Sequence, residues 1–403
     1  MSMNNRLLCR RVLRVVMFRY GIAFFVLVAG GCFFPSYLFP SPRPPGLDEK
    51  GVLVGTQLFD KKVFVQLPES IEGPLQVWDI ANSNGSEDTD DSILITTRWG
   101  YVFKTNWTTR TTFVTGNLEN GLGSHEFLDL ENDGQPELLC AGDTYGVCSI
   151  TGEALWSKVA NTSSYQTNLG AGDLDGDGLL EVYIGFSNGL FCYNSSGVEL
   201  WRVGEDDFYE EVVNGENVPK GFSQVIASVA RGPVPATSDI YLEFREADGR
   251  LSHSFVVPHA YRNFTLVPWL AGENSYSLLA KTGGATVVFL DLHGRETFRF
   301  TPPSREWTAQ GLKASVIQLG PAGEEKPFLA ILLPYAVEWD RASLLLFSTS
   351  NELVYHEIIG QGNGLLATRD PSTNEPVLLA SDGVDTISIY RFAPELSTSI
   401  PKP

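Results

Sequence analysis

The segment DLENDGQPELLCA at residues 129–141 returns without a gap as DLDGDGLLEVYIG at residues 173–185. Each copy begins with an acidic loop, continues into an apolar run and ends further on in Gly-x-x-Leu-Trp, at Trp156 and Trp201. The acidic loops are 44 residues apart (173 minus 129) and the tryptophans 45 (201 minus 156). A repeat of this length that holds several short strands is typical of one blade of a β-propeller.

Weaker copies of the same rhythm of strand and turn flank these two units. One unit is expected upstream, from residue 77 to 103, and four further units downstream, from residue 223 to 391. The 39 Gly and 23 Pro residues supply the turns that many short strands need, and no long amphipathic helix pattern is present. The sequence therefore predicts an all-β fold, a β-propeller of about seven four-stranded blades over residues 52–398.

The last of these units contains only three clear strands before the chain ends. A strand without a partner is expected near the start of the domain, at residues 62–67 (KVFVQL). If it pairs with the last unit, it completes the seventh blade and closes the ring, which removes the exposed edges of an open sheet.

The first 31 residues have the features of a membrane-targeting segment. They contain five arginines and no acid, and an apolar run from Tyr20 to Gly31 precedes Cys32. We expect a signal peptide or membrane anchor at residues 1–31 and a Pro-rich linker at 32–51. The small residues before Cys32 resemble a bacterial lipoprotein signal, and this resemblance implies that Cys32 is lipidated.

Two alternatives to a lipoprotein signal stay open. Residues 20–39 carry no charge and are long enough for an uncleaved anchor helix, and an ordinary cleaved signal also fits. The arginines upstream are expected to stay in the cytoplasm in either membrane-bound case. We therefore predict an extracytoplasmic, membrane-anchored domain.

The charge of the chain limits its partners. The formal net charge is -19, and without the five leader arginines 24 basic residues face 48 acidic ones. Such a surface repels phosphate backbones, so no nucleic-acid binding is expected. It favours cations and partners with basic patches.

The acidic loop at residues 173–181 has the pattern Asp-x-Asp-Gly-Asp-Gly-x-x-Glu. Side-chain oxygens at positions 1, 3, 5 and 9 suit a hard cation such as Ca²⁺, which takes about six to eight oxygen ligands. The loop differs from an EF-hand, in which the Glu comes three positions later and helices flank the loop. Here an apolar strand follows at once.

These loops and the strands around them resemble the FG-GAP repeat family (integrin α-chain-like, VCBS-type), strongly over residues 125–201. The resemblance implies that each loop joins two strands of a blade and binds a stabilising Ca²⁺ ion. The ligands it implies are Asp173, Asp175, Asp177, Glu181 and the carbonyl of Leu179 in one loop, and Asp129, Glu131, Asp133, Glu137 and, at the position of Leu179, Gln135 in the other. The loop at residues 129–137 departs from the family at Glu131 and Asn132. The copy near Asp79 breaks the spacing and is expected to bind no metal.

No catalytic motif is found in the sequence. The histidines occur singly, at His125, His253, His259, His293 and His356. There is no Gly-x-Ser-x-Gly elbow and no phosphate-binding Gly-rich loop. We therefore expect a binding module for a protein or glycan partner rather than an enzyme. The alternative is a surface or periplasmic enzyme on a propeller, such as a polysaccharide lyase or a quinone-dependent dehydrogenase.

Two smaller questions stay open. The eight tryptophans fit aromatic packing between blades, and a sugar-stacking platform is the alternative. The globular part holds three cysteines, Cys140, Cys148 and Cys192, too few for a disulfide framework. Buried free thiols are expected, although Cys140 and Cys148 flank a turn and one disulfide between them is possible.

Overall fold

The structure is a computed structural model that describes residues 58–67, 77–79, 92–96, 101–117, 124–133, 135–141, 144–159, 166–204, 207–213, 224–230, 240–258, 260–269, 276–282, 284–302, 309, 311–320, 325–335, 341–360, 364–382 and 385–393. The chain divides between Pro44 and Pro45, and all of these residues belong to the second unit. The predicted leader at 1–31, Cys32 and the linker at 32–51 lie outside the described residues. Within the described ranges, no helix has the length and apolarity needed to cross a membrane.

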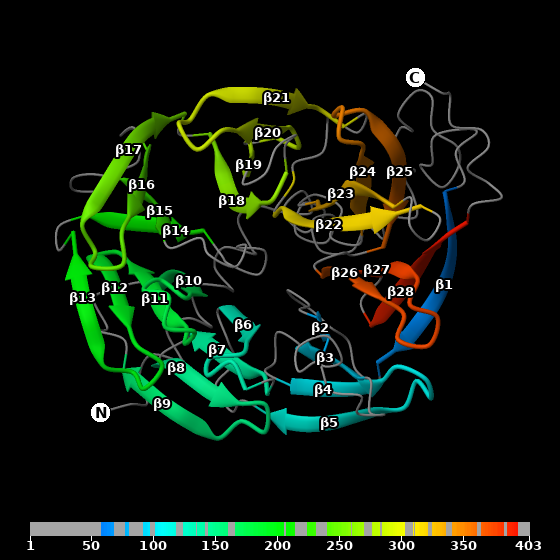
Figure 1. Ribbon diagram of the computed structural model, residues 1–403, viewed down its shortest axis with the longest axis horizontal. Helices are drawn as coiled ribbons and strands as arrows, with labels where there is room; N and C mark the ends of the chain where they lie inside the picture. The colour runs from blue at the N-terminus through cyan, green and yellow to red at the C-terminus, as the bar shows by residue number, and fades with distance from the viewer. Residues whose placement is uncertain are drawn as a thin grey trace, which may run out of the picture. The chain divides into compact units, whose positions relative to one another are not determined.

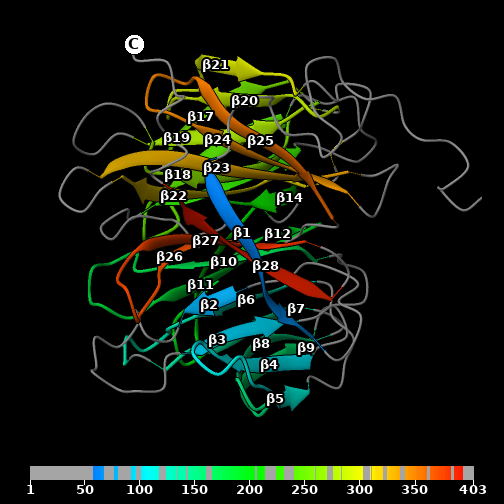
Figure 2. The same cartoon turned by 90° about the vertical axis from the view of Figure 1, so that its right-hand side faces the viewer.

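The second unit consists of seven antiparallel sheets of four strands each, arranged as the blades of a ring (Figures 1 and 2). Blades 1 to 3 are formed by β2 (Val77–Asp79), β3 (Ser92–Thr96), β4 (Tyr101–Asn106) and β5 (Thr112–Asn117); β6 (Ser124–Leu128), β7 (Glu137–Ala141), β8 (Thr144–Ser149) and β9 (Ala154–Val159); and β10 (Gln166–Gly172), β11 (Glu181–Phe186), β12 (Gly189–Tyr193) and β13 (Glu199–Val203). Blades 4 to 6 are formed by β14 (Phe208–Val212), β15 (Val225–Ala230), β16 (Ile240–Arg245) and β17 (Leu251–Val257); β18 (Arg262–Val267), β19 (Ser277–Lys281), β20 (Val287–Leu290) and β21 (Glu296–Phe300); and β22 (Lys313–Leu319), β23 (Lys326–Pro334), β24 (Ala342–Phe347) and β25 (Leu353–Ile359). Blade 7 is formed by β26 (Leu365–Arg369), β27 (Pro376–Ser381), β28 (Thr386–Phe392) and β1 (Phe59–Gln66). The seven-bladed, all-β prediction is confirmed.

The burial of each strand follows from its place in a blade. The second and third strands are covered on both faces by neighbouring blades, so strands such as β11 and β24 are buried at every position. Outer strands such as β9 and β13 alternate between partly covered and exposed residues. The buried apolar side chains form seven clusters, and each cluster joins two neighbouring blades. The core is therefore a ring of interfaces between blades.

The predicted closure of the ring is confirmed. Strand β1 pairs antiparallel with β28, from Phe59 opposite Phe392 to Gln66 opposite Thr386. The first strand of the domain is thus the outer strand of the last blade, and the two ends of the domain are joined by a backbone ladder. Apolar residues of β1 enter the clusters on both sides of blade 7: Phe59 faces blade 6, and Phe64 faces blade 1.

The tryptophans of the repeat link neighbouring blades. Trp156 of blade 2 donates from Nε1 to the carbonyl of Ser195 in blade 3, at 2.9 Å. Trp201 of blade 3 donates to the carbonyl of Ala247 in blade 4, at 2.7 Å. Each ring lies against a glycine of the next blade's last turn; at Gly197, φ is +75° and an added Cβ would lie 2.6 Å from the Trp156 ring. For these two tryptophans the packing interpretation is confirmed.

Candidate functional site

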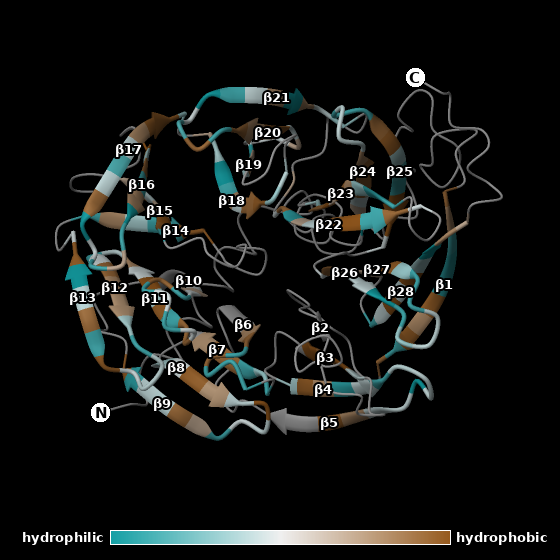
Figure 3. Cartoon of the chain, viewed as in Figure 1, coloured by the Kyte–Doolittle hydropathy of each residue, from teal (hydrophilic) through white to brown (hydrophobic). Residues whose placement is uncertain are grey.

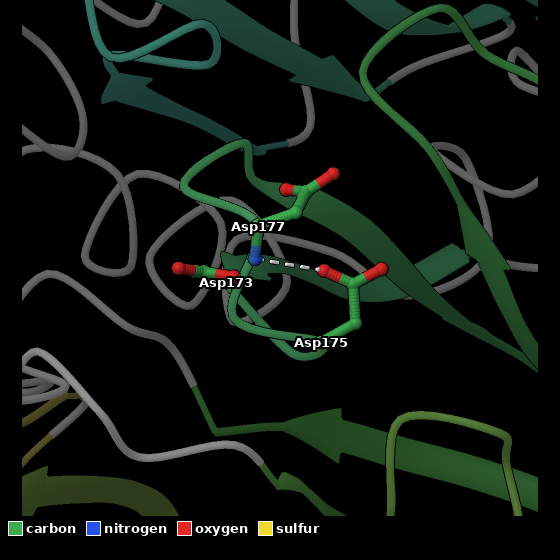
Figure 4. A group of neighbouring side chains, drawn as sticks. All are labelled: Asp173, Asp175 and Asp177. Atoms are coloured by element: carbon green, nitrogen blue, oxygen red, sulfur yellow. Dashed lines mark hydrogen bonds between the residues drawn. The ribbon is translucent and has the colours of Figure 1, made fainter.

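The loop at residues 173–181 connects β10 to β11 in blade 3. It brings one carboxylate oxygen each of Asp173, Asp175 and Asp177 within 4.8 Å of one another (Figure 4). Gly176 and Gly178 allow this curl, because both have left-handed φ values, +82° and +90°. These three carboxylates are the part of the predicted ligand set that the structure gathers most closely.

Backbone amides fix the orientation of these carboxylates. Asp173 accepts hydrogen bonds from the N–H groups of Gly176 at 2.7 Å and Gly178 at 3.2 Å. Asp175 accepts from the N–H of Asp177, and Asp177 accepts from the N–H of Leu179. The three side chains are therefore held facing the interior of their own turn.

Glu181 closes the loop from its far end. Its Oε2 accepts a hydrogen bond of 2.8 Å from the N–H of Leu174, and its side chain is buried. Burial raises the pKa of Glu181, and the charges of the three nearby aspartates, chiefly Asp175, raise it further. The loop thus concentrates negative charge that nothing among the described residues neutralises in place, and a cation there would relieve the repulsion.

The loop at residues 129–137, between β6 and β7 of blade 2, keeps part of this hydrogen-bond pattern, but its Asp129 accepts from the N–H of Asp133 at 2.9 Å, four positions on. Glu137 accepts from the N–H of Leu130 at 2.8 Å, and Asp133 accepts from the N–H of Gln135 at 2.7 Å. Asn132, which replaces the Gly of the repeat, has φ of +54°, a conformation that Asn tolerates better than most residues. The departure at Asn132 therefore does not disturb the turn.

The two loops differ in how closely they gather their acids. Among the described residues, Asp129, Glu131 and Asp133 do not form a group as tight as the three aspartates of blade 3. Burial, followed by the charges of its acidic neighbours, raises the pKa of Glu137 to about 7. The arrangement of blade 3 is the better prepared of the two for a cation.

A direct hydrogen bond joins the two loops. The N–H of Leu180 donates to the carbonyl of Leu130 at 3.0 Å. The N–H of Leu180 and the carbonyl of Leu179, an expected ligand, belong to one peptide group. The N–H of Leu130 in turn donates to Glu137, an expected ligand in the loop at residues 129–137. Leu130 and Leu180 also belong to the apolar cluster between blades 2 and 3, so the acidic loops lie where these blades meet.

The donor set of the blade 3 loop fits a calcium ion. Hard oxygen atoms come from three converging carboxylates, from Glu181 and from the Leu179 carbonyl, and Ca²⁺ prefers such ligands. Bound there, the ion would supply charge neutralisation and cross-linking of the loop. The expected role of such an ion is structural, because it would relieve the mutual repulsion of the carboxylates.

The structure also contains a buried network of polar side chains that no sequence motif predicts. In blade 6, His356 Nε2 lies 3.0 Å from the Ser343 hydroxyl, which also contacts the hydroxyl of Tyr335 at 2.5 Å. All three side chains are buried, and His356 Nδ1 has no hydrogen-bond partner among the described residues. A serine next to a histidine suggests a nucleophile, but here neither group meets solvent. These three hydrogen-bonded side chains are therefore part of the core.

Because His356 is buried, we expect the stability of the fold to decrease in acid. Burial lowers the pKa of His356 from 6.5 to about 4. Between those pH values the unfolded chain binds a proton at this position that the folded protein does not, so folding stability falls as the pH falls. The loss is up to about 3 kcal/mol between pH 6.5 and 4.

Urea titrations across this pH range test the prediction by comparing the wild type with His356→Gln. The variant keeps a polar group near Ser343 but has no charge to gain, so its stability should fall less with acid. Parallel pH profiles for the two proteins would contradict the assignment.

Among known proteins, solved structures are similar to this chain, whereas sequence families are not. No protein-family profile and no curated protein sequence matches it. Its fold is similar to the crystal structure of BBS1N in complex with ARL6DN, soaked with lead, with a TM-score of 0.57 and 12% identity over 84% of this chain and 97% of that one. The same complex soaked with mercury gives a TM-score of 0.57 at 10% identity, over 84% and 98% of the two chains. At this identity the likeness establishes the fold alone: the protein is a seven-bladed β-propeller.

Proposed function

We propose that this protein is a calcium-stabilised propeller, tethered outside the cytoplasm, whose outer rim binds a protein partner. The observation that carries the proposal is the position of the exposed apolar side chains. All the large hydrophobic residues exposed in the described part, except Leu179, lie on or next to outer strands. They are Val63, Phe113, Val114, Leu155, Val159, Val198, Leu200, Leu251 and Val256.

These residues occupy five consecutive blades. They belong to β1 of blade 7 and to β5, β9, β13 and β17 of blades 1 to 4, and several of these strands show apolar segments in Figure 3. The described residues of β21 and β25, the outer strands of blades 5 and 6, contribute none. Exposed apolar side chains gathered on one part of a surface are typical of a binding site for another protein. The acidic character of the chain favours a partner with basic residues around the contact.

The tether rests on the leader alone: five arginines, an uncharged apolar run and Cys32. Lipidation requires the Cys32 thiol, so Cys32→Ser should move a lipoprotein into the soluble fraction. Unchanged membrane association of the variant would point to an anchor helix, and a soluble wild type would contradict the tether.

Substitutions of the exposed apolar residues on the outer strands are expected to weaken binding of the partner without unfolding the protein. Leu155→Glu and Leu200→Glu place a charge on exposed positions of β9 and β13, where neither leucine belongs to the buried core. Each should weaken capture of the native partner by about tenfold or more, as expected for a central interface residue, without changing the melting temperature. Quantitative affinity purification from the native membrane measures the effect.

Thr297→Glu is the matched control for the rim variants. It introduces the same charge at an exposed position of β21 in blade 5, where the described rim lacks large apolar residues. Normal capture by this control and poor capture by the two leucine variants support the proposal. Equal capture by all three variants would contradict it.

A further inference from the structure

Two cysteines of blade 2 lie next to each other on paired strands. Cys140 of β7 is opposite Gly146, and Cys148 of β8 is opposite Leu138, so the two cysteines are diagonal neighbours on one face of the sheet. Both side chains contact the apolar cluster between blades 1 and 2. The Cys140 thiol donates to the carbonyl of Leu138 at 3.4 Å, and both cysteines are free in the structure.

The packing of a blade does not require this pair. The corresponding positions in blade 3 are Ile184, opposite Phe191, and Tyr193, opposite Val182. The third cysteine, Cys192, is on the other face of its blade, in the cluster between blades 3 and 4. Blade 2 therefore has two cysteines on one face where its sister blade has an aliphatic and an aromatic side chain.

The two thiols are not equivalent. Cys140 is 6% exposed, whereas Cys148 is only half-buried and is the thiol that a reagent reaches first. The neighbouring Cys140 thiol lowers the pKa of Cys148, although burial partly opposes this. Thiolates, rather than thiols, attack disulfides, so Cys148 is placed to react first and Cys140 to complete the reaction.

We propose that Cys140 and Cys148 form a reversible disulfide across the β7–β8 hairpin when a disulfide oxidant is present. With oxidised glutathione, the Cys148 thiolate attacks one sulfur, forming a mixed disulfide and releasing one glutathione thiolate. Cys140 then gives up its proton and attacks Cys148 Sγ, which breaks the mixed bond and releases the second glutathione thiolate. The two cysteine protons go to the two leaving thiolates, so the protein loses two electrons and the oxidant gains them.

The bond would staple the hairpin that begins at Glu137, beside the acidic loop of blade 2. It would form in an oxidising compartment and be absent in a reducing one. The pairing of Cys140 with Cys148 involves neither the expected calcium ligands nor the exposed apolar residues of the rim.

Peptide mapping of the full chain tests the proposal. Folded protein is treated with oxidised glutathione, then denatured without reductant and alkylated. Trypsin releases Cys140 and Cys148 together in the peptide 111–158 and Cys192 in the peptide 159–202. We expect the first peptide to be two hydrogen atoms lighter and to carry no alkyl group, and the second to carry one. Treatment with dithiothreitol should restore two alkylated cysteines to the first peptide.

Conservative variants identify the role of each thiol. Cys140→Ser should trap glutathione on Cys148, Cys148→Ser should leave Cys140 reduced, and Cys192→Ser should close the bond as the wild type does. The proposal is overturned if both cysteines of the oxidised wild type still take the alkylating reagent, or if glutathione stays on Cys148 while Cys140 is present.

Discussion

Deletion of residues 52–68 is expected to abolish cooperative folding of the domain. The deletion removes β1, which supplies the fourth strand of blade 7 and pairs with β28 along its length. It also removes five buried apolar side chains from the two interfaces of that blade: Leu58, Phe59, Phe64, Val65 and Leu67. At about 1.5–3 kcal/mol for each side chain, the loss is about 7–15 kcal/mol. That is as large as the entire stability of an ordinary domain.

Thermal unfolding followed by circular dichroism and calorimetry measures this effect. The truncated chain should show no cooperative transition and should expose apolar surface to a hydrophobic dye. A sharp transition at the temperature of the full chain would show that the ring does not depend on β1.

Adjacent lysines of β1 provide a milder version of the same test. Lys61 Nζ lies 2.9 Å from Glu357 of blade 6 and 2.6 Å from Asp382 of blade 7, so it joins three strand segments. Lys62 is largely exposed, and in the described part of the chain its ion pair is with Asp60. Lys61→Met leaves two partly buried carboxylates without their cation and should cost about 1–3 kcal/mol. Lys62→Met should change stability by less than about 0.5 kcal/mol.

Calcium is expected to raise the melting temperature of the domain by on the order of 5–10 °C over its value in EDTA. Each occupied loop stabilises the folded state by about 2.7 kcal/mol when free calcium is a hundredfold above its dissociation constant. Most of the gain should come from blade 3, where Asp173, Asp175 and Asp177 already converge. The ion would also fix the Leu179–Leu180 peptide, whose N–H holds the carbonyl of Leu130 in blade 2.

Asp173→Ala should remove most of the difference between calcium and EDTA. Asp248→Ala is the control, since Asp248 is also an exposed turn aspartate that accepts a backbone N–H, but it lies outside the acidic loops. The same melting temperature with calcium and with EDTA in the wild type, or the same loss in both variants, would rule out the proposed metal.

The features that the sequence predicted are those that depend on local pattern. The repeat with Trp156 and Trp201 set the blade length, because every blade needs the same few strands and turns to cover its neighbour. The unpaired apolar segment at 62–67 predicted the closure, and the observed strand, Phe59–Gln66, begins three residues earlier. The spacing of the aspartates in the loop at 173–181 predicted that they share one turn. The structure confirms that the carboxylates of Asp173, Asp175 and Asp177 lie close together.

The features that the sequence did not reveal depend on contacts between distant segments. Lys61 and Glu357 are 296 residues apart, and no local pattern marks them as partners. Ser343 and His356 meet only because the register of β24 and β25 places them on one face. The bond between Leu180 and Leu130 uses backbone atoms, which carry no signal in side-chain identity. These contacts follow from strand register and from the packing of blades, which the residue pattern of a single strand does not specify.

The central claim, that the apolar rim binds a protein, is tested most directly by site-specific photo-cross-linking in the native membrane. A photoreactive amino acid is placed at Leu155, Leu200 or Thr297 in otherwise unchanged protein. We expect one shared cross-linked partner from Leu155 and Leu200 and none from Thr297. Cross-linking of equal yield from Thr297, or no partner at either leucine, would contradict it.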